Sequence, residues 1–201
     1  MISTFLVLVV GFLSHFLYEW SNHNVLVGIL CPVNESIWEH LKLIYYPMLI
    51  PFFFHFNKKY FQARISGILI SILFLLVSFY TYSGIIGQNF AVINILLYIT
   101  TILLGQFLIS IFYQNEIFFP FSLSLLFFFL LFFSFTLFTF YPPKLSVFQD
   151  PISCTYGILQ YRKWFFSSIL SLFALLQSHR CCSTLHTKYH HIHQRFFHIQ
   201  M

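Results

Sequence analysis

The sequence predicts an all-α protein, a polytopic transmembrane helix bundle with five to six spans. Of the 201 residues, 59% are hydrophobic and only 7% are charged, whereas a soluble domain carries about 25% charged residues. The apolar residues fall in long runs that reach the roughly 20 residues needed to cross a bilayer. The stretches between these runs are too short to form a soluble domain. The lipid bilayer is therefore the expected surrounding of most of the chain.

Five spans are placed by their length and their nearly continuous apolarity. They cover residues 2–20, 37–56, 65–83, 91–112 and 117–140. A sixth candidate, near 158–178, contains Arg162 and Lys163, so it either crosses the bilayer or lies in the interface. The chain accordingly divides into a transmembrane helical domain, 1–157, and a segment, 158–201, that holds the doubtful span and a tail rich in histidine and cysteine.

Basic residues set the expected orientation, because short cytoplasmic loops are enriched in Lys and Arg. The densest short cluster is Lys58, Lys59 and Arg64, which places the 57–64 loop in the cytoplasm. The N-terminus then also lies in the cytoplasm of a multi-pass cell-membrane protein. The segments expected on the outside are 21–36, 84–90 and 141–157.

The net charge of +5 does not indicate nucleic acid as a partner. The basic residues flank apolar runs, whereas nucleic-acid binding needs a basic stripe or patch. The four cysteines form no CxxC pair and no dense disulfide framework. Composition thus leaves the bilayer as the predicted partner, and it does not identify a protein partner or a cofactor.

Acidic residues are few and unevenly placed. The chain has only five, and three of them, Glu19, Glu35 and Glu39, lie close together in the sequence. Ionisable groups at membrane depth are costly, so this concentration makes a functional site the first hypothesis. His15 and Glu19 are four residues apart and share a helix face. They form either a proton-relay or cation-binding pair, or a histidine that is simply satisfied by its neighbour.

The polar stretch before the second span favours the start of a helix. Ser36 and Glu39 match a capping box, in which Ser36 accepts from the Glu39 amide and the Glu39 carboxylate accepts from the Ser36 amide. This cap would begin a helix at Ile37 and needs no ligand.

A metal site is the alternative interpretation of the same stretch. Hard and borderline cations accept sets of nitrogen and oxygen ligands. Against a metal, the HExxH and ExxH spacings are missing, and His40 lies about 100° from Glu39 around a regular helix. The residues that would supply ligands are His15, Glu19, Glu35, Glu39 and His40.

A polar loop follows the fifth span and carries Asp150. Its Pro, Ser and Gly residues favour turns, so an ordered loop explains it without a ligand. The predicted topology nevertheless places Asp150 on the same face as Glu19 and Glu35.

Three strings carry a family resemblance. They are His15-Phe-Leu-Tyr-Glu-Trp20, then Pro32-Val-Asn-Glu-Ser-Ile-Trp-Glu-His-Leu-Lys42, and the loop with Pro142-Pro143, Phe148-Gln-Asp-Pro151 and Thr155-Tyr-Gly157. Together they resemble an uncharacterised family of multi-pass membrane proteins found mainly in Firmicutes, the domain of unknown function 6512. The resemblance covers about residues 5–157 and implies no activity, substrate or cofactor.

These observations favour a protein that handles a small solute or an ion in a polar vestibule at the outer ends of the helices. One alternative is a membrane-embedded enzyme that uses Glu19 or Glu39 as a general base beside His40 or a metal. Another is a structural or partner-binding membrane subunit, which needs no site. The vestibule residues are His15, Glu19, Asn34, Glu35, Glu39, His40 and Asp150.

Overall fold

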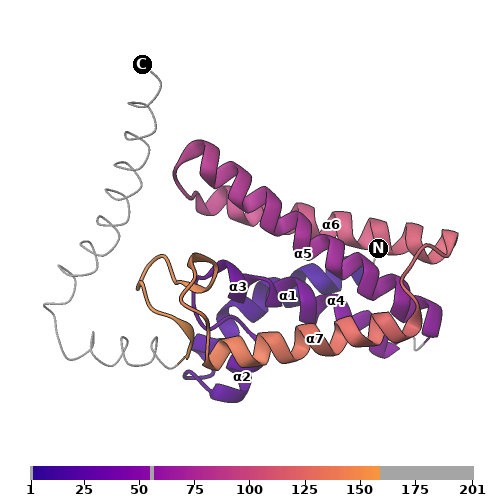
Figure 1. Cartoon of the computed structure of the whole chain (residues 1–201), viewed down its shortest axis with the longest axis horizontal. Coiled ribbons are helices and arrows are strands. Elements are labelled where there is room, and N and C mark those ends of the chain that lie inside the picture. The colour runs from indigo at the N-terminus through magenta and orange to yellow at the C-terminus, as the bar shows by residue number, and fades with distance from the viewer. Residues whose placement is uncertain (1, 55–56, 159–201) are drawn as a thin grey trace, which may run out of the picture.

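The computed structural model describes residues 2–54 and 57–158, and over these ranges the protein is a bundle of helices, as predicted (Figure 1). The predicted sixth span and tail lie outside the described residues, apart from Ile158. The elements are α1 (Ile2–Trp20), α2 (Val25–Leu30), α3 (Ile37–His40), α4 (Lys42–Phe54), α5 (Lys58–Ile86), α6 (Ala91–Asn115), α7 (Phe121–Phe140) and the 3-10 helix η1 (Ser146–Phe148).

Four helices of the described part are long and apolar enough to cross a membrane: α1, α5, α6 and α7. They correspond to four of the predicted spans. Helix α5 starts at Lys58, earlier than predicted, because the Asn57 side chain caps it by accepting a hydrogen bond of 2.9 Å from the Lys59 amide. It ends at Gly87, whose φ of 72° closes the helix in the left-handed conformation that glycine adopts without strain.

The span predicted over 37–56 is divided at Leu41. The Leu41 amide bonds to the carbonyls of Ile37 and Trp38 at 3.3 and 3.2 Å, which closes the short helix α3 with a tight turn. Helix α4 follows with 13 residues. At 1.5 Å per residue, these 13 described residues extend over about 20 Å. Leu41 itself keeps right-handed helical backbone angles, so α3 and α4 follow one another directly within the predicted range, up to Phe54 in the described residues.

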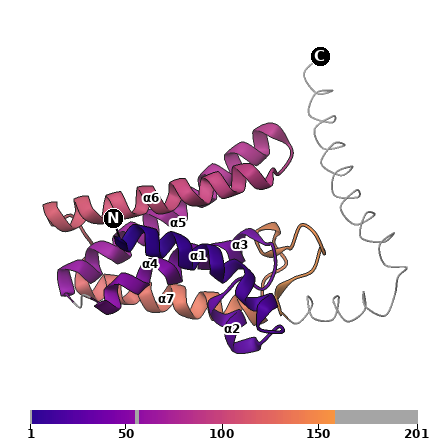
Figure 2. The same cartoon turned by 180° about the vertical axis from the view of Figure 1, so that it is seen from behind.

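Helix α4 forms the centre of the bundle. It packs against α1 and α5, and α5 in turn packs against α6 and α7. Figure 2 shows α5 and α6 as a long hairpin beside the other helices. Close packing of apolar side chains joins the helices. The fully enclosed apolar residues include Val7, Ile44, Met48, Ile65, Ile102 and Phe135, each 0% exposed.

A proline and a glycine fix the contact between α1 and α4. Pro47 has no N–H, so the Leu43 carbonyl one turn earlier loses its helical donor. Helix α1 approaches this carbonyl at Gly11, where a Cβ would stand 3.0 Å from the Leu43 oxygen. Gly11 thus lets the two backbones come together at the point that Pro47 opens.

Arg64 corrects one step of the orientation argument. The sequence analysis counted it as a loop charge, but it lies within α5 and is 1% exposed. Its guanidinium donates to the Met48 carbonyl and to the Tyr60 hydroxyl, and it lies 4.6 Å from the centre of the Tyr60 ring. The exposed basic residues at this end are Lys58 and Lys59, and Lys59 pairs with Glu116.

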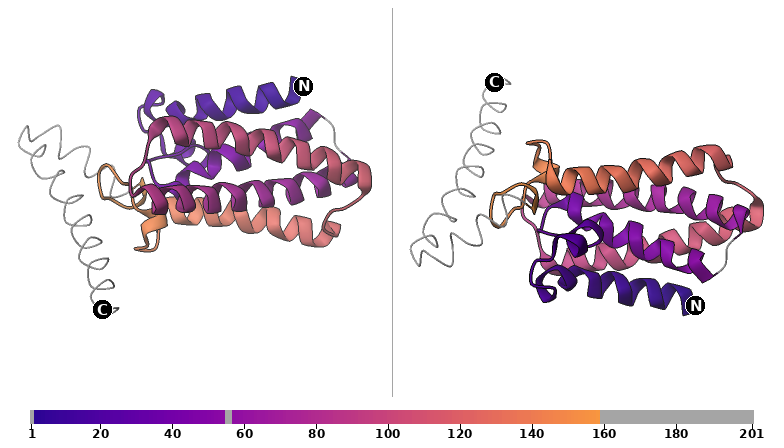
Figure 3. Two further views of the ribbon diagram at one scale, coloured as in Figure 1. Left: turned by 90° about the horizontal axis from the view of Figure 1, so that it is seen from above. Right: turned by 90° about the horizontal axis from the view of Figure 1, so that it is seen from below.

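The connecting segments gather at the two ends of the bundle. Figure 3 shows the helices running side by side, with the 141–157 loop at the end opposite the N-terminus. The segments 21–36, 84–90 and 141–157 share that end (Figure 1), which is the grouping that the sequence predicted. Helix α3 lies there because Trp38 packs against Phe148 of η1 at 4.8 Å between ring centres.

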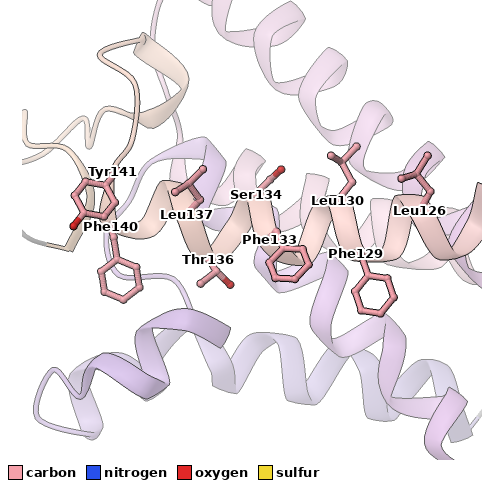
Figure 4. Close-up of a pocket in the computed structure, with 9 residues that line it drawn as sticks. All are labelled: Leu126, Phe129, Leu130, Phe133, Ser134, Thr136, Leu137, Phe140 and Tyr141. Carbon is pink, nitrogen blue, oxygen red and sulfur yellow. The ribbon is translucent and has the colours of Figure 1, made fainter.

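A groove with a mainly apolar lining runs along α7 (Figure 4). It has a volume of about 690 Å³, and its lining carries no charged side chain. An apolar groove on a helix of this kind suits lipid chains. The polar residues singled out by the sequence lie elsewhere.

Candidate functional site

Helix α3 begins with half of the predicted capping box. The Ser36 hydroxyl accepts from the Glu39 amide at 3.4 Å, as predicted. The return bond is different, because the Ser36 amide donates to Asn34 Oδ1 at 3.0 Å. Asn34 therefore closes the turn, and the Glu39 carboxylate is directed to other partners.

Glu39 forms an ion pair with Lys42 in the interior of the bundle. Lys42 Nζ lies 2.7 Å from Glu39 Oε2, and the two side chains are 0% and 2% exposed. Lys42 also donates to the Thr139 hydroxyl of α7 at 2.6 Å and to the Gly28 carbonyl of α2 at 2.9 Å. The Val33 amide donates to Glu39 Oε2 at 3.0 Å. We call Glu39, Lys42 and Thr139 the enclosed network.

The partners of the enclosed network indicate what it does. The three protons of the Lys42 ammonium have three acceptors at 2.6 to 2.9 Å. A buried charge pair is tolerated only when hydrogen bonds satisfy both groups in this way. The network ties the segment before α4 to α2 and α7, and these three short contacts use the three N–H donors of Lys42.

A second group of ionisable residues opens toward the surface, and we call it the His–Glu cluster. It consists of His15 on α1, Glu35 before α3 and His40 at the end of α3. His15 Nε2 lies 3.6 Å from Glu35 Oε1, and His40 Nε2 lies 3.5 Å from Glu35 Oε2. The side chains are 28%, 43% and 29% exposed for His15, Glu35 and His40, so solvent reaches the cluster.

Hydrogen bonding within α3 fixes the direction of the His40 ring. Its Nδ1 lies 2.9 Å from the Ser36 carbonyl, to which it can only donate because that oxygen is an acceptor. The lone pair of neutral His40 is then on Nε2, which faces Glu35. The contacts at 3.5 and 3.6 Å exceed the usual length of an N–H···O hydrogen bond. The Glu35 carboxylate and the two Nε2 atoms thus converge at distances longer than direct hydrogen bonds.

The cluster has the dimensions of a metal site. One ligand atom from each of its three residues lies within 4.8 Å of the other two. A zinc ion bonds nitrogen and oxygen at about 2.0–2.2 Å, and its tetrahedral ligand atoms are about 3.4 Å apart. Small side-chain movements would bring the three ligands to that spacing.

The remaining predicted site residues lie outside the His–Glu cluster. Glu19 is exposed, one turn from His15, and Asn34 is buried in the turn before α3. Asp150 is 1% exposed and is used by its own loop. Its Oδ1 accepts from the Ile152 amide at 3.0 Å, and its Oδ2 accepts from the Ser153 hydroxyl.

Sequence reasoning missed two members of the enclosed network. Lys42 was quoted only within a longer motif, although a charge inside an apolar span is itself a signal of a specific partner. It also lies three residues after Glu39, a spacing that brings side chains together on a helix. Thr139 stands in a phenylalanine-rich run, and nothing in the sequence marks it.

One known family matches the part of the chain that contains the His–Glu cluster and the enclosed network. The profile of a family of unknown function matches residues 1–158. The chain belongs to this family, DUF6512. The match extends over α1 to η1, so the His–Glu cluster and the enclosed network both lie within the DUF6512 region. Comparison with curated proteins and with solved structures gave no match.

Proposed function

We propose that this DUF6512 protein handles a small cation or cationic solute in the membrane, at the end of the bundle where α1 meets α3. The convergence of Glu35 with Nε2 of His15 and of His40 carries the proposal. A carboxylate flanked by two imidazole nitrogens offers three ligand atoms to a cation, and the negative charge of Glu35 attracts a positive species to them. A partly exposed position lets such a species enter from water.

The proposed setting is the cell membrane, with the His–Glu cluster on the outer side and the N-terminus in the cytoplasm. Lys58 and Lys59 support this orientation, because both are exposed at the opposite end of the bundle. A cation would then reach the His–Glu cluster from outside the cell.

Binding at this end does not by itself move the cation across the membrane. Beyond the cluster, α1 and α4 meet in the apolar core that contains Val7, Ile44 and Met48. A charge crossing such a core pays a large desolvation penalty. Transport would therefore need a rearrangement of α1 against α4, whereas sensing or capture would not.

A membrane-embedded enzyme is the second candidate. Two histidines and one glutamate are also the ligands of hydrolytic zinc sites, which keep a fourth position for water. Such an enzyme needs a separate general base. Glu39 is held by Lys42 at 2.7 Å, so the exposed Glu19 suits that part better.

A ligand panel on the purified full-length protein tests the proposal. Thermal unfolding in detergent is recorded with inorganic cations, organic ammonium ions, and anions as the opposite class. A ligand that binds the folded state raises the unfolding temperature by mass action. We expect a cation to do so in the natural protein and in Glu116→Gln, whose carboxylate lies at the other end, but not in Glu35→Gln. Stabilisation by anions alone, or by cations equally in Glu35→Gln, would contradict the proposal.

A further inference from the structure

We infer that the His–Glu cluster is a binding site for a divalent cation of the zinc class, held by His15, Glu35 and His40. This inference rests on the proposed function and specifies its ligand. Its first support is that the three residues come from different segments, α1, the turn before α3, and α3 itself. The fold has brought together ligands that no sequence spacing encodes.

The ligand types decide the class of ion. Two imidazole nitrogens with one carboxylate suit zinc and its borderline neighbours, whereas Mg²⁺ and Ca²⁺ prefer sets made only of oxygen. The two imidazole rings lie 5.3 Å apart between centres and are tilted by 43°. That arrangement allows both Nε2 atoms to reach one ion beside the carboxylate.

The two histidines differ in the hydrogen bonding of Nδ1, the ring nitrogen that would not bind the ion. The Ser36 carbonyl fixes the His40 ring through Nδ1 at 2.9 Å, which is the usual device for presenting Nε2 to a metal. His15 Nδ1 is buried and has no hydrogen-bond partner among the described residues. His40 is thus already oriented for coordination, and His15 completes the site from α1.

Three protein ligands leave a tetrahedral ion with one open position. In the described structure the Glu35 side chain is 43% exposed, so water or an external ligand can reach an ion that is bound there. A closed structural zinc site has four protein ligands, and its metal does not exchange readily. We therefore expect an exchangeable ion, as a handling function requires.

The tail must be silenced before the site can be measured. The sequence after the described residues contains side chains that also bind zinc. The experiment uses the full-length chain with these residues replaced, histidines by glutamine and cysteines by serine. They are His179, Cys181, Cys182, His186, His190, His191, His193 and His198. We call this protein the tail-silent background.

Titration with Co²⁺ and Zn²⁺ in the tail-silent background then tests the inference. Co²⁺ bound by nitrogen and oxygen ligands gives visible d–d bands without the near-ultraviolet band of a thiolate, so the spectrum reports the ligand set. We expect one equivalent per chain, competed by Zn²⁺ and not by excess Mg²⁺. Glu35→Gln, His15→Gln and His40→Gln should each weaken binding by roughly 100-fold, at least the loss seen for second-shell changes.

Matched controls separate ligand loss from general damage. His23 is a half-buried histidine at the same end of the molecule with a φ of 59°, a conformation that asparagine tolerates. His23→Asn and Glu116→Gln should keep full affinity. Far-UV circular dichroism and gel filtration verify that each variant is folded.

Each outcome has a defined meaning. The inference is wrong if the folded tail-silent background binds neither ion, or if Glu35→Gln and His40→Gln bind as tightly as the background. If the ligand panel meanwhile finds another cation that depends on Glu35, the proposed function stands and only the zinc-class assignment fails. If no cation of any class depends on Glu35, both fail.

Discussion

Glu35 and Glu39 are the same residue type four positions apart, yet they lie in opposite surroundings. Glu39 is 2% exposed, is paired with Lys42 at 2.7 Å and accepts from a backbone amide. Glu35 is 43% exposed and faces two histidine nitrogens at 3.5 and 3.6 Å. The comparison indicates that the groups around a glutamate decide whether its carboxylate stabilises an apolar helix bundle or is available to a ligand.

The backbone at Ser36 creates this difference. On a continuous helix, residues four apart would share a face. Ser36 is extended, with φ −69° and ψ 149°, and Glu35 precedes it outside helix α3. Glu39 and His40, both inside α3, then point away from each other. Within this short motif, Glu39 therefore points into the interior of the bundle, while Glu35 and His40 lie toward the surface.

The largest effect should follow from breaking the enclosed network. Lys42→Met leaves the Glu39 carboxylate buried without its cation, and the loss of one partner of a buried pair costs about 3–5 kcal/mol. We expect a corresponding fall in the free energy of unfolding, measured by denaturant titration in micelles. Lys144→Met, at an exposed position of the 141–157 loop, is the control and should change little. Equal stability of the two variants would show that the pair contributes nothing.

A smaller loss should follow from removing the link to α7. Thr139→Val keeps the shape but deletes the hydroxyl that accepts from Lys42 at 2.6 Å. A hydrogen bond to a charged group contributes about 1.5–3 kcal/mol. Thr139→Ser should retain most of that stability, as judged by the same titration. If serine and valine behave alike, the hydroxyl has no role and the contact is packing alone.

Cys31 reports whether the enclosed region stays closed. The residue is 6% exposed, and its carbonyl lies 3.5 Å from Lys42 Nζ. Burial raises the pKa of the Cys31 thiol, while the Lys42 charge opposes that rise. Since the thiolate is the reactive form, maleimide should label Cys31 at least roughly tenfold more slowly than the half-buried Cys154. Loss of the Lys42 charge alone would raise the Cys31 pKa further and slow the labelling. We nevertheless expect faster labelling in Lys42→Met, because the unpaired Glu39 opens the enclosed region, whereas Glu35→Gln should leave the protection intact. The tail cysteines are serine in all samples.

The smallest effect on stability is expected at the His–Glu cluster. Without divalent cations, Glu35→Gln should change the free energy of unfolding by less than about 0.5 kcal/mol, because exposed substitutions away from caps and cores are nearly neutral. Denaturant titration with a chelator present measures it. A loss of several kcal/mol would mean that Glu35 has a structural role like that of Glu39.

The sequence predicted the elements with strong signals and missed those that depend on distant partners. Long apolar runs located α1, α5, α6 and α7, and Ser36 predicted the start of α3. The division at Leu41, the buried position of Arg64 and the partner of Glu39 were not predicted. The contact of Lys42 with Thr139 joins residues 97 positions apart, which no local pattern encodes.

The three residues of the His–Glu cluster were predicted from the sequence as site residues. His15, Glu35 and His40 were all named, because charged and polar residues are rare in apolar spans. The expected partner of His15 was Glu19, since the two share a helix face. In the structure, Glu35 is the acid that meets His15 at 3.6 Å. Local helix geometry suggested one neighbour, and the packing of α3 against α1 supplied another.

The most direct test compares Glu35→Gln with Thr139→Val in the tail-silent background, with and without zinc. At a zinc concentration of 100 times the dissociation constant, binding should stabilise the unchanged protein by about 2.7 kcal/mol. Our account predicts that Thr139→Val starts less stable but gains the full zinc increment, while Glu35→Gln starts at normal stability and gains none. The reverse pattern, or a full increment in Glu35→Gln, would contradict the division of this motif into an enclosed network and an open cation site.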